Sequence, residues 1–539
     1  MLFGMFLDDF EMHMQSTVPS ALAQLPLLGS CIVPPLLFAD DMLLISTSVA
    51  GLNAQLRSLQ AYCDAKKLTV NAAKTQVVIL RPGGGGGGRL AAGEAFFYAG
   101  QPLEVVKTIK YLGLTFAQLS KAHGFACCAE TLAGAGRRAL FAMRRRAWEM
   151  GAGAVEHQLR LFDIFVQPVL SYGCEIWGVD LLDQPASTPE RVQRWFCRRL
   201  LGLSQGASSA VALAELGRWP LQVRWVQQLV RYWNRLLELQ GSGRLISCAF
   251  QDNIALMQEQ LALKVRTGRE VPSPCWSLRW LRSLASTAPT DTGTLLGVTE
   301  LDEKLVMERA RVEFVRAAAG SINLGTEMGA GNSPRLLVQR SLSGAGIQEG
   351  GPTVPISTPP TGMGAAEGRV VGQEQQGDEG VYPGLGPSGS ASCRGIPPPI
   401  VKAHSKFAVY QECVRGDTPL GSLAAHLTLG AVHDWRHRIG LSRFRCSSHG
   451  LRVESDRYLP VAIKPPRHLR TCLLCASNLV ENEHHLVFDC PLYDGQRFEF
   501  ADLFSTECRT LPCFLNQPNQ DRVAQFIYAC LDLRRSATQ

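Results

Sequence analysis

The chain has 539 residues, which is room for about three or four domains of ordinary size. Its 54 basic and 47 acidic residues give a net charge of +7, which favours an anionic partner only mildly. The 17 cysteines follow no secretory signal, so we expect a reducing compartment in which cysteines bind metal rather than form disulfides. Residues 12–39 carry no charge, but Pro19, Pro26, Pro34 and Pro35 interrupt them, which excludes a transmembrane helix.

The stretch "PPLLFADDMLLIS", residues 34–46, places Asp40 and Asp41 between two apolar runs of strand length. This pattern predicts a tight β-hairpin with both carboxylates at its tip. Such a pair suits Mg²⁺, which prefers hard oxygen ligands and shares its shell with nucleotide phosphates and water. Two-metal phosphoryl transfer would need at least one further carboxylate from a neighbouring strand. The alternative is an ordinary surface turn, in which two adjacent aspartates are common.

Three further elements complete the N-terminal part of the chain. Apolar side chains between residues 52 and 63 recur at helical spacing and predict a helix. The stretch "KLTVNAAKTQVVIL" predicts a turn followed by a strand over Gln76–Leu80, and Gly83–Gly88 predict a flexible loop insertion. The segment "IKYLGLTF", Ile109–Phe116, predicts a second short hairpin.

The pattern from 120 to 240 is helical and basic, and residues 241–324 are still largely helical. Residues 325–400 are rich in Gly, Pro, Ser and Gln, which predicts a disordered linker. A second folded segment spans 401–539. Short hairpins followed by many helices indicate the α+β class.

A cysteine-histidine cluster lies in the last segment. Cys472 and Cys475 are followed by His485 and Cys490, and this spacing is typical of a closed tetrahedral Zn²⁺ site with three thiolates and one imidazole. His484 competes with His485, but the four residues between His485 and Cys490 favour His485 as the ligand. A buried cysteine cluster without metal is the alternative.

Five segments together carry a resemblance to a known family. The chain shows "LLFADD", "LTVNAAKT" and "YLGLTF" in this order, followed by "PVLSYGCEIWG" and "LAELGRWPL". It resembles a reverse transcriptase of the LINE-type, non-LTR retrotransposon class, which is an RNA-directed DNA polymerase (a nucleotidyltransferase). The resemblance implies a partial polymerase palm over 1–119, a helical thumb over 120–240, a helical connector over 241–324 and a small zinc-binding C-terminal module.

The resemblance also assigns roles to residues. Asp40 would be the principal Mg²⁺ ligand and Asp41 its weaker partner, while Lys74 would lie near the phosphates of the incoming nucleotide. An ordinary turn lysine is an equally good interpretation of Lys74, and Asn71 could simply cap that turn. Contacts with nucleic acid would come from Tyr111, Leu112 and Gly113 in the second hairpin, and from the arginines Arg144, Arg145 and Arg146.

Cations also surround the cysteine-histidine cluster. The basic residues there are Arg443, Arg445, Arg452, Arg457, Arg467, His468 and Arg470. We expect them to face a phosphate backbone, so that the partners are an RNA template and a DNA primer or target. With no signal peptide or membrane span, we expect a nuclear or cytoplasmic location.

The chain departs from the family at its start. The family's fingers, its first catalytic aspartate and its Q-G-x-x-x-S-P segment find no counterpart, because "MLFGMFLDDFE" resembles the helix that follows that segment. Asp8 and Asp9 lie at the end of this helix, where the family has acids without catalytic duty. We therefore expect no polymerase activity from this chain alone. The alternatives are a non-catalytic nucleic-acid-binding remnant that uses thumb and zinc module, and a polymerase completed by a second polypeptide.

Overall fold

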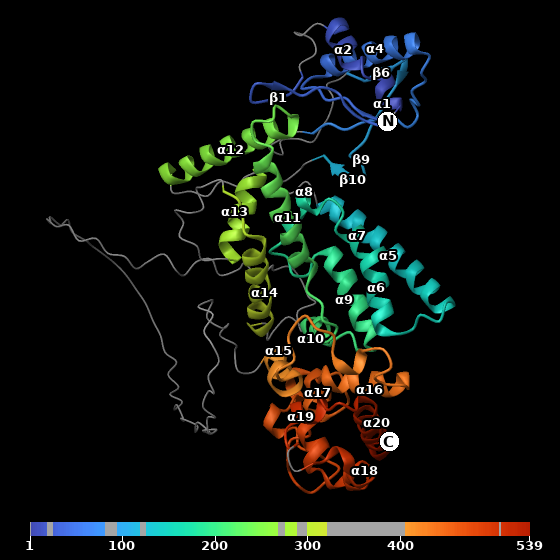
Figure 1. Ribbon diagram of the computed structural model, residues 1–539, viewed down its shortest axis with the longest axis vertical. Coiled ribbons are helices and arrows are strands. Elements are labelled where there is room, and N and C mark those ends of the chain that lie inside the picture. The colour runs from blue at the N-terminus through green and yellow to red at the C-terminus, as the bar shows by residue number, and fades with distance from the viewer. Residues whose placement is uncertain are drawn as a thin grey trace, which may run out of the picture. The chain divides into compact units, whose positions relative to one another are not determined.

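The computed structural model describes residues 2–18, 25–80, 94–118, 126–267, 275–287, 299–320, 405–505 and 508–538 (Figure 1). Helices dominate, and the strands are short and form two-stranded sheets, which agrees with the α+β class. The glycine run Gly83–Gly88 and the expected linker over 325–400 lie outside the described residues. In the part that the structure describes, no helix combines the length and the apolar run needed to cross a bilayer.

The N-terminal region, residues 2–118, is built from short elements. These are α1 (Leu2–Phe6), α2 (Phe10–Thr17), β1 (Leu27–Leu28), β2 (Cys31–Ile32), β3 (Leu36–Phe38), β4 (Asp41–Leu43), α4 (Val49–Lys66), β5 (Gln76–Val77), β6 (Phe97–Tyr98), β7 (Gln101–Pro102), β8 (Glu104–Val105), β9 (Thr108–Tyr111) and β10 (Leu114–Ala117). Helix α4 confirms the predicted helix, and Ser48 caps it by accepting a hydrogen bond from the backbone N–H of Gly51.

Both predicted hairpins of this region are present, as β3–β4 and β9–β10. The strand expected over Gln76–Leu80 is shorter than predicted and ends at Val77. Its parallel partner β8 also has only two residues, and the pairing of the two strands ends at Val77 and Val105. The region has its own small core, in which Phe10 packs edge-on against Tyr62.

The helical region, residues 126–320, follows the prediction for 120–240 and continues beyond it. Its helices are α5 (Ala126–Glu149), α6 (Val155–Phe165), α7 (Gln167–Leu170), α8 (Cys174–Trp177), η1 (Gly178–Leu181), α9 (Thr188–Leu200), α10 (Ser209–Glu215), α11 (Leu221–Glu238), α12 (Leu245–Thr267), α13 (Trp276–Thr287) and α14 (Glu303–Gly320). The longest of them alternate buried apolar and exposed polar faces, which is the pattern of helices packed on one side.

The C-terminal module, residues 405–538, consists of short helices and turns around two longer helices, α16 (Trp435–Arg445) and α20 (Gln520–Thr538). The others are α15 (Lys406–Tyr410), η3 (Gln411–Arg415), η4 (Ala425–Leu427), α17 (Arg452–Ser455), η5 (Asp456–Tyr458), η6 (Val461–Ile463), η7 (Arg467–Leu469), η8 (His485–Asp489), η9 (Pro491–Tyr493), α18 (Asp494–Glu499), η10 (Ala501–Leu503) and α19 (Leu511–Leu515).

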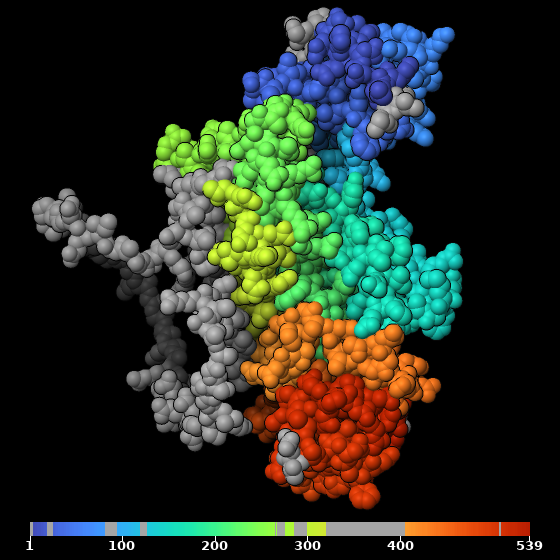
Figure 2. Space-filling view, viewed as in Figure 1, coloured from blue at the N-terminus to red at the C-terminus, as the bar shows by residue number. Residues whose placement is uncertain are grey.

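The largest hydrophobic core contains side chains of both the helical region and the C-terminal module. Phe196 and Trp225 belong to it, and so do Phe444, Phe514 and Phe526. In Figure 2 the orange segment that begins at Ser405 lies against the helical region without a break. The two parts therefore share one apolar interior, although residues 321–404 separate them in the chain.

Two cysteines depart from the expectation that cysteines here bind metal rather than form disulfides. Cys31 in β2 and Cys248 in α12 form a disulfide, with their Cα atoms 6.4 Å apart. The β1–β2 hairpin contacts α12, and this contact brings together two residues that are 217 positions apart in the chain. Such a pair has no local sequence signature, so the prediction was wrong for these two residues.

Candidate metal centres and nucleic-acid contacts

The paired aspartates lie at the tip of the β3–β4 hairpin, as predicted. Phe38 pairs with Asp41, so Ala39 and Asp40 form a two-residue turn. Ala39 has a φ of 51°, a left-handed value that such turns need at their first central residue and that alanine adopts reluctantly. Both carboxylates are exposed to solvent, so the apolar runs on either side of them do not bury their charge.

The Asp41 carboxylate acts electrostatically on one residue of the second hairpin. Burial of the phenol and, after it, the nearby Asp41 carboxylate raise the pKa of Tyr111. Among the described residues, no third Cys, His, Asp or Glu joins Asp40 and Asp41 in a group able to hold a metal ion. Two carboxylates can hold one Mg²⁺ together with phosphates and water, but a two-metal centre requires a further carboxylate. The described donors on this part of the chain therefore do not complete a two-metal centre.

Two further candidate residues of the N-terminal region, Asp9 and Asn71, have partners within the protein. Asp9 pairs with the Lys66 ammonium at 2.7 Å, and it lies at the start of α2 rather than beside Asp40. The Asn71 side chain accepts a hydrogen bond of 3.2 Å from the backbone N–H of Lys74, so Asn71 caps the turn. Lys74 is exposed, and no described contact joins it to either aspartate.

The tip of the β9–β10 hairpin packs against the segment "SYG" of the helical region. Leu112 and Gly113 have φ values of 46° and 83°, which form a tight hairpin turn. Tyr172 donates a hydrogen bond of 2.9 Å to the backbone carbonyl of Leu112. A Cβ on Gly113 would lie 2.8 Å from the Tyr172 ring, and one on Gly173 would lie 2.9 Å from Leu114. Glycine is required at both positions because the two segments approach so closely.

The segment "LAELGRWPL" lies at the contact between the helical region and the C-terminal module. Leu216 forms an isolated β-bridge with Leu423, and the backbone N–H of Ala424 donates to the carbonyl of Glu215 at 3.0 Å. A Cβ on Gly217 would lie 2.6 Å from the backbone carbon of Ser422, so no other residue fits there without a shift.

Glu215 is fully buried at this contact and carries a network of charged and polar partners. The Arg445 guanidinium and the Tyr410 hydroxyl donate to its carboxylate, and His426 Nδ1 lies 3.6 Å away. Burial opposes ionisation of Glu215, but the charge of Arg445 and the hydrogen bonds from Arg445 and Tyr410 outweigh it and bring the pKa of Glu215 below the ordinary value. Burial lowers the pKa of His426 to about 3, so this imidazole is neutral in the folded chain. No local pattern indicates this network, because its members are up to 230 residues apart in the chain.

The predicted cysteine-histidine cluster is assembled. The ligand atoms of Cys472, Cys475, His485 and Cys490 all lie within 4.8 Å of one another, and three of the four residues are buried. His485 Nε2 lies 3.4 Å from Cys475 Sγ, whereas His484 faces solvent and pairs with Asp489 at 3.0 Å. The structure thus favours His485 over His484, as the spacing indicated. A group of three thiols and one imidazole can hold a metal such as zinc.

Burial shifts the pKa values of the groups in this cluster. Burial raises the pKa of Cys472, and it raises that of Cys490 to about 12, so both stay protonated unless a positive charge is present. Burial also lowers the pKa of His485, which keeps the imidazole neutral as metal ligation requires. His485 Nδ1 is buried and has no hydrogen-bond partner in the described structure.

Three of the basic residues expected to face a phosphate backbone around the cluster are structural instead. Arg445 is buried against Glu215, Arg470 is buried and donates to the carbonyl of Val453, and Arg452 pairs with Asp456. The prediction of surface cations was therefore wrong for these three residues, because short-range charge patterns do not show which arginines have buried acceptors. The exposed members are Arg443, Arg467 and His468, and Arg457 is half-buried.

The arginines of α5 stand on an exposed part of that helix. Arg145 and Arg146 both pair with Glu149, at 3.5 Å and 3.1 Å, and Arg144 lies 5.6 Å from the centre of the Trp195 ring. Next to them Trp148 is 86% exposed, an unusual position for a tryptophan. Cations beside an exposed aromatic ring are the combination that single-stranded nucleic acid contacts use.

Comparisons of this chain with protein-family models, with curated proteins and with solved structures found no significant match.

Proposed function

We propose that this protein is of the non-LTR reverse-transcriptase type and that it acts by binding nucleic acid. One observation carries the proposal: two motif segments that lie far apart in the sequence adjoin each other. Tyr172 of "SYG" donates a hydrogen bond to the backbone carbonyl of Leu112 and so holds the turn of "YLG". The Asp41 carboxylate of "LLFADD" adds to the effect of burial in raising the pKa of Tyr111 beside that turn. A hairpin turn held against a helical region, together with carboxylates at a second hairpin tip, is what a polymerase palm would need around a primer end.

The number of carboxylates at the β3–β4 hairpin tip limits the catalysis that we propose for this chain. Asp40 and Asp41 are the only carboxylates at the hairpin tip among the described residues, and a two-metal centre requires more. We therefore infer that RNA-directed DNA synthesis needs carboxylates beyond these two. In this proposal Tyr111, Leu112 and Gly113 line the primer side, and Lys74 is a turn residue.

The C-terminal module supplies the other half of the proposed function. Zn²⁺ held by Cys472, Cys475, His485 and Cys490 would contribute a closed structural centre with no open coordination position. Exposed cations on the module and on α5 would hold the phosphate backbone of an RNA template or a DNA primer without reading its sequence. Trp148 adds a flat surface on which a base can stack.

The experiment that tests this proposal uses the full chain with zinc. Filter binding with a single-stranded RNA and with an RNA–DNA primer-template measures affinity, and a primer-extension assay with Mg²⁺ measures synthesis, each with Asp40→Ala as control. We expect binding without synthesis, and equal binding by Asp40→Ala. If the unaltered chain synthesises DNA and Asp40→Ala does not, the catalytic centre is complete. That result would overturn the inference that synthesis needs carboxylates beyond Asp40 and Asp41. Absence of binding to either nucleic acid would overturn the proposal as a whole.

A further inference from the structure

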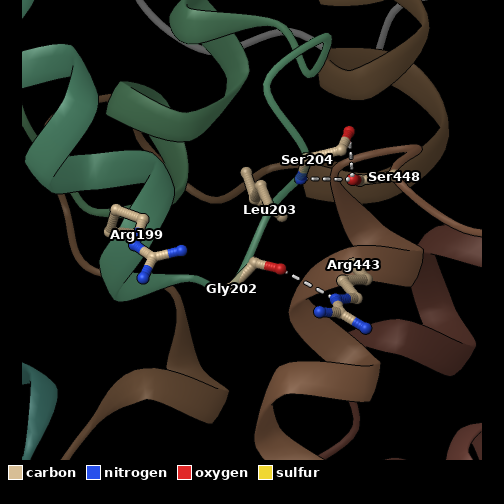
Figure 3. A pocket seen from close by; sticks show the side chains of 6 residues that line it. All are labelled: Arg199, Gly202, Leu203, Ser204, Arg443 and Ser448. Carbon is tan, nitrogen blue, oxygen red and sulfur yellow. Dashed lines mark hydrogen bonds between the residues drawn. The ribbon is translucent and has the colours of Figure 1, made fainter.

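A pocket of about 350 Å³ lies where the loop after α9 meets α16 of the C-terminal module. Figure 3 shows it from close by, with the guanidinium groups of Arg199 and Arg443 on either side of Gly202. The residues that line it are Arg199, Gly202, Leu203, Ser204, Arg443 and Ser448. Its size is at the lower end of the range of about 300–1,000 Å³ for small-ligand sites, which fits a small occupant.

The walls of this pocket are fixed by contacts between the two parts of the molecule. Arg443 Nε donates to the carbonyl of Gly202 at 2.8 Å, and Ser448 Oγ accepts from the backbone N–H of Ser204 at 3.2 Å. Gly202 has a φ of 66°, and a Cβ there would lie 2.8 Å from Ile439. The loop thus has a set position against the module, so the groups that line the pocket are preorganised.

No carboxylate of the described residues balances the positive charge of the two arginines at this pocket. Two other arginines of the same helices have a carboxylate partner, since Arg194 pairs with Glu190 and Arg445 pairs with Glu215. Arg199 and Arg443 have none among the residues that the structure describes. Arg199 stands 5.9 Å from the centre of the Trp195 ring, and only the Nε of Arg443 is used by the protein. Two unpaired guanidinium groups at one cavity attract an anion.

The serine hydroxyls add a further donor. Ser204 Oγ and Ser448 Oγ lie 3.1 Å apart, and either can donate to the other. Whichever hydroxyl donates, the hydrogen of the second one stays free for a ligand. The pocket therefore offers the outer nitrogens of Arg443, the guanidinium of Arg199 and one hydroxyl. This all-donor set suits a group whose several oxygens only accept hydrogen bonds.

We propose that this pocket binds a single phosphate group. Arginine forks match phosphate oxygens in pairs, and a tetrahedral phosphate can accept from two forks and a hydroxyl at once. The phosphate can be a phosphodiester of bound nucleic acid or free inorganic phosphate, and the phosphodiester source rests on the proposed function. Binding at this position joins α9 and the C-terminal module to the same strand of nucleic acid.

The experiment measures two ligands with the zinc-loaded full chain. Fluorescence anisotropy with a labelled single-stranded RNA of mixed sequence gives affinity over a range of salt concentrations, and titration calorimetry gives the binding of inorganic phosphate. The variants are Arg199→Gln with Arg443→Gln, and separately Ser204→Asp, which places a carboxylate at the exposed rim of the pocket. Arg191→Gln, an exposed arginine at the other end of α9, is the matched control.

We expect both pocket variants to weaken RNA binding by about tenfold or more. We also expect the slope of log affinity against log salt concentration to fall by about one, which corresponds to the loss of one phosphate contact. Arg191→Gln should change neither the affinity nor the slope. Loss of phosphate binding with unchanged RNA binding would still support a phosphate site and assign it to the free ion. If both ligands bind Ser204→Asp and the double variant as they bind the unaltered chain, the proposal is overturned. An unaltered chain that binds no RNA would count against the proposed function instead, and the phosphate titration would then decide the pocket alone.

Discussion

The N-terminal region and the C-terminal module are stabilised in different ways. In the N-terminal region the strands have two to four residues, each sheet has two strands, and tight turns at Ala39 and Leu112 hold the candidate contacts in place. In the C-terminal module the candidate groups are buried and held by side chains that are distant in the sequence, such as Glu215 against Arg445. A motif in a tight turn is visible in sequence, whereas a buried charge network is not.

The two regions also differ in how far their candidate functional groups are exposed to solvent. The carboxylates of Asp40 and Asp41 face water, so their cost to the fold is small and their loss should hardly affect stability. Three ligands of the cysteine-histidine cluster and Glu215 are buried, and there a single substitution leaves an uncompensated group.

The largest effect is expected at the cysteine-histidine cluster. Structural Zn²⁺ contributes about 10–16 kcal/mol in zinc-finger peptides, so removal of one thiolate should abolish cooperative unfolding of the module. We expect Cys490→Ser to lose bound zinc by mass spectrometry and to lose the thermal transition followed by near-UV circular dichroism. His484→Ala leaves all four ligands in place and should keep both. Wild-type zinc content and an unchanged Tm in Cys490→Ser would contradict a metal centre here.

The next largest effect is expected at Glu215. Its replacement by alanine leaves Arg445 charged and buried without a partner, which typically costs about 3–5 kcal/mol of unfolding free energy. Glu303→Ala is the control, because its pair with Arg231 is exposed and should contribute less than about 1 kcal/mol. Urea unfolding measures both.

A second substitution sharpens this test. Arg445→Met in the Glu215→Ala background removes the unpaired charge and should recover part of the lost stability. If the single variant Glu215→Ala unfolds at the same urea concentration as the unaltered chain, the network does not hold the two parts together.

The acid dependence of stability should report on the same network. His426 is neutral in the folded chain, with a pKa of about 3 against its ordinary value of 6.5, because burial disfavours its charge. Between these two values the unfolded chain binds more protons than the folded one. Stability is therefore complete above pH 6.5 and falls by up to roughly 1.4 kcal/mol per pH unit as the pH drops from about 6.5 toward 3.

His426→Gln is the variant that isolates this effect. Glutamine does not titrate and can still bond to Ser442, the partner of His426 Nε2 at 2.9 Å. The other charged groups that face His426 are Glu215, Arg445 and Arg438, and they stay in place. We expect a shallower loss of Tm with falling pH. Equal pH profiles for the two proteins would show that His426 does not contribute to the acid sensitivity.

These differences explain which features could be predicted from the sequence. Both hairpins followed from apolar runs around a tight turn, and the cysteine-histidine cluster followed from ligand spacing over 19 residues, 472–490. Local spacing suffices for such features because turn geometry and metal geometry fix it.

Long-range features could not be predicted in this way. Arg445, Arg452 and Arg470 have the same sequence context as surface cations, and only the folded chain supplies their buried acceptors. The Cys31–Cys248 disulfide also depends on the contact of the β1–β2 hairpin with α12, which no local pattern indicates. Local patterns in the sequence therefore indicate the groups with a candidate chemical role, but not the distant groups that hold them in place.

A smaller effect is expected at the tip of the β9–β10 hairpin. Gly113→Ala places a Cβ 2.8 Å from the Tyr172 ring at a φ of 83°, which should destabilise the hairpin by about 1–2 kcal/mol. Hydrogen exchange of residues 108–117 measures the change. Gly100→Ala is the matched control, because its φ is 73° but no atom lies within 4 Å of the added Cβ. Equal losses in the two variants would mean that the Tyr172 contact adds nothing to the backbone strain.

The smallest effect is expected at Ala39, and it has the opposite sign. Glycine adopts the φ of 51° found there without the penalty that alanine carries, so Ala39→Gly should relieve strain and slow hydrogen exchange in the β3–β4 hairpin, by no more than about 1 kcal/mol. Ala99→Gly, at a φ of 49° in the β6–β7 turn, should behave alike. Faster exchange in Ala39→Gly alone would show that the alanine methyl group makes a contact that outweighs the strain, and the position of Asp40 would then depend on packing rather than on the turn.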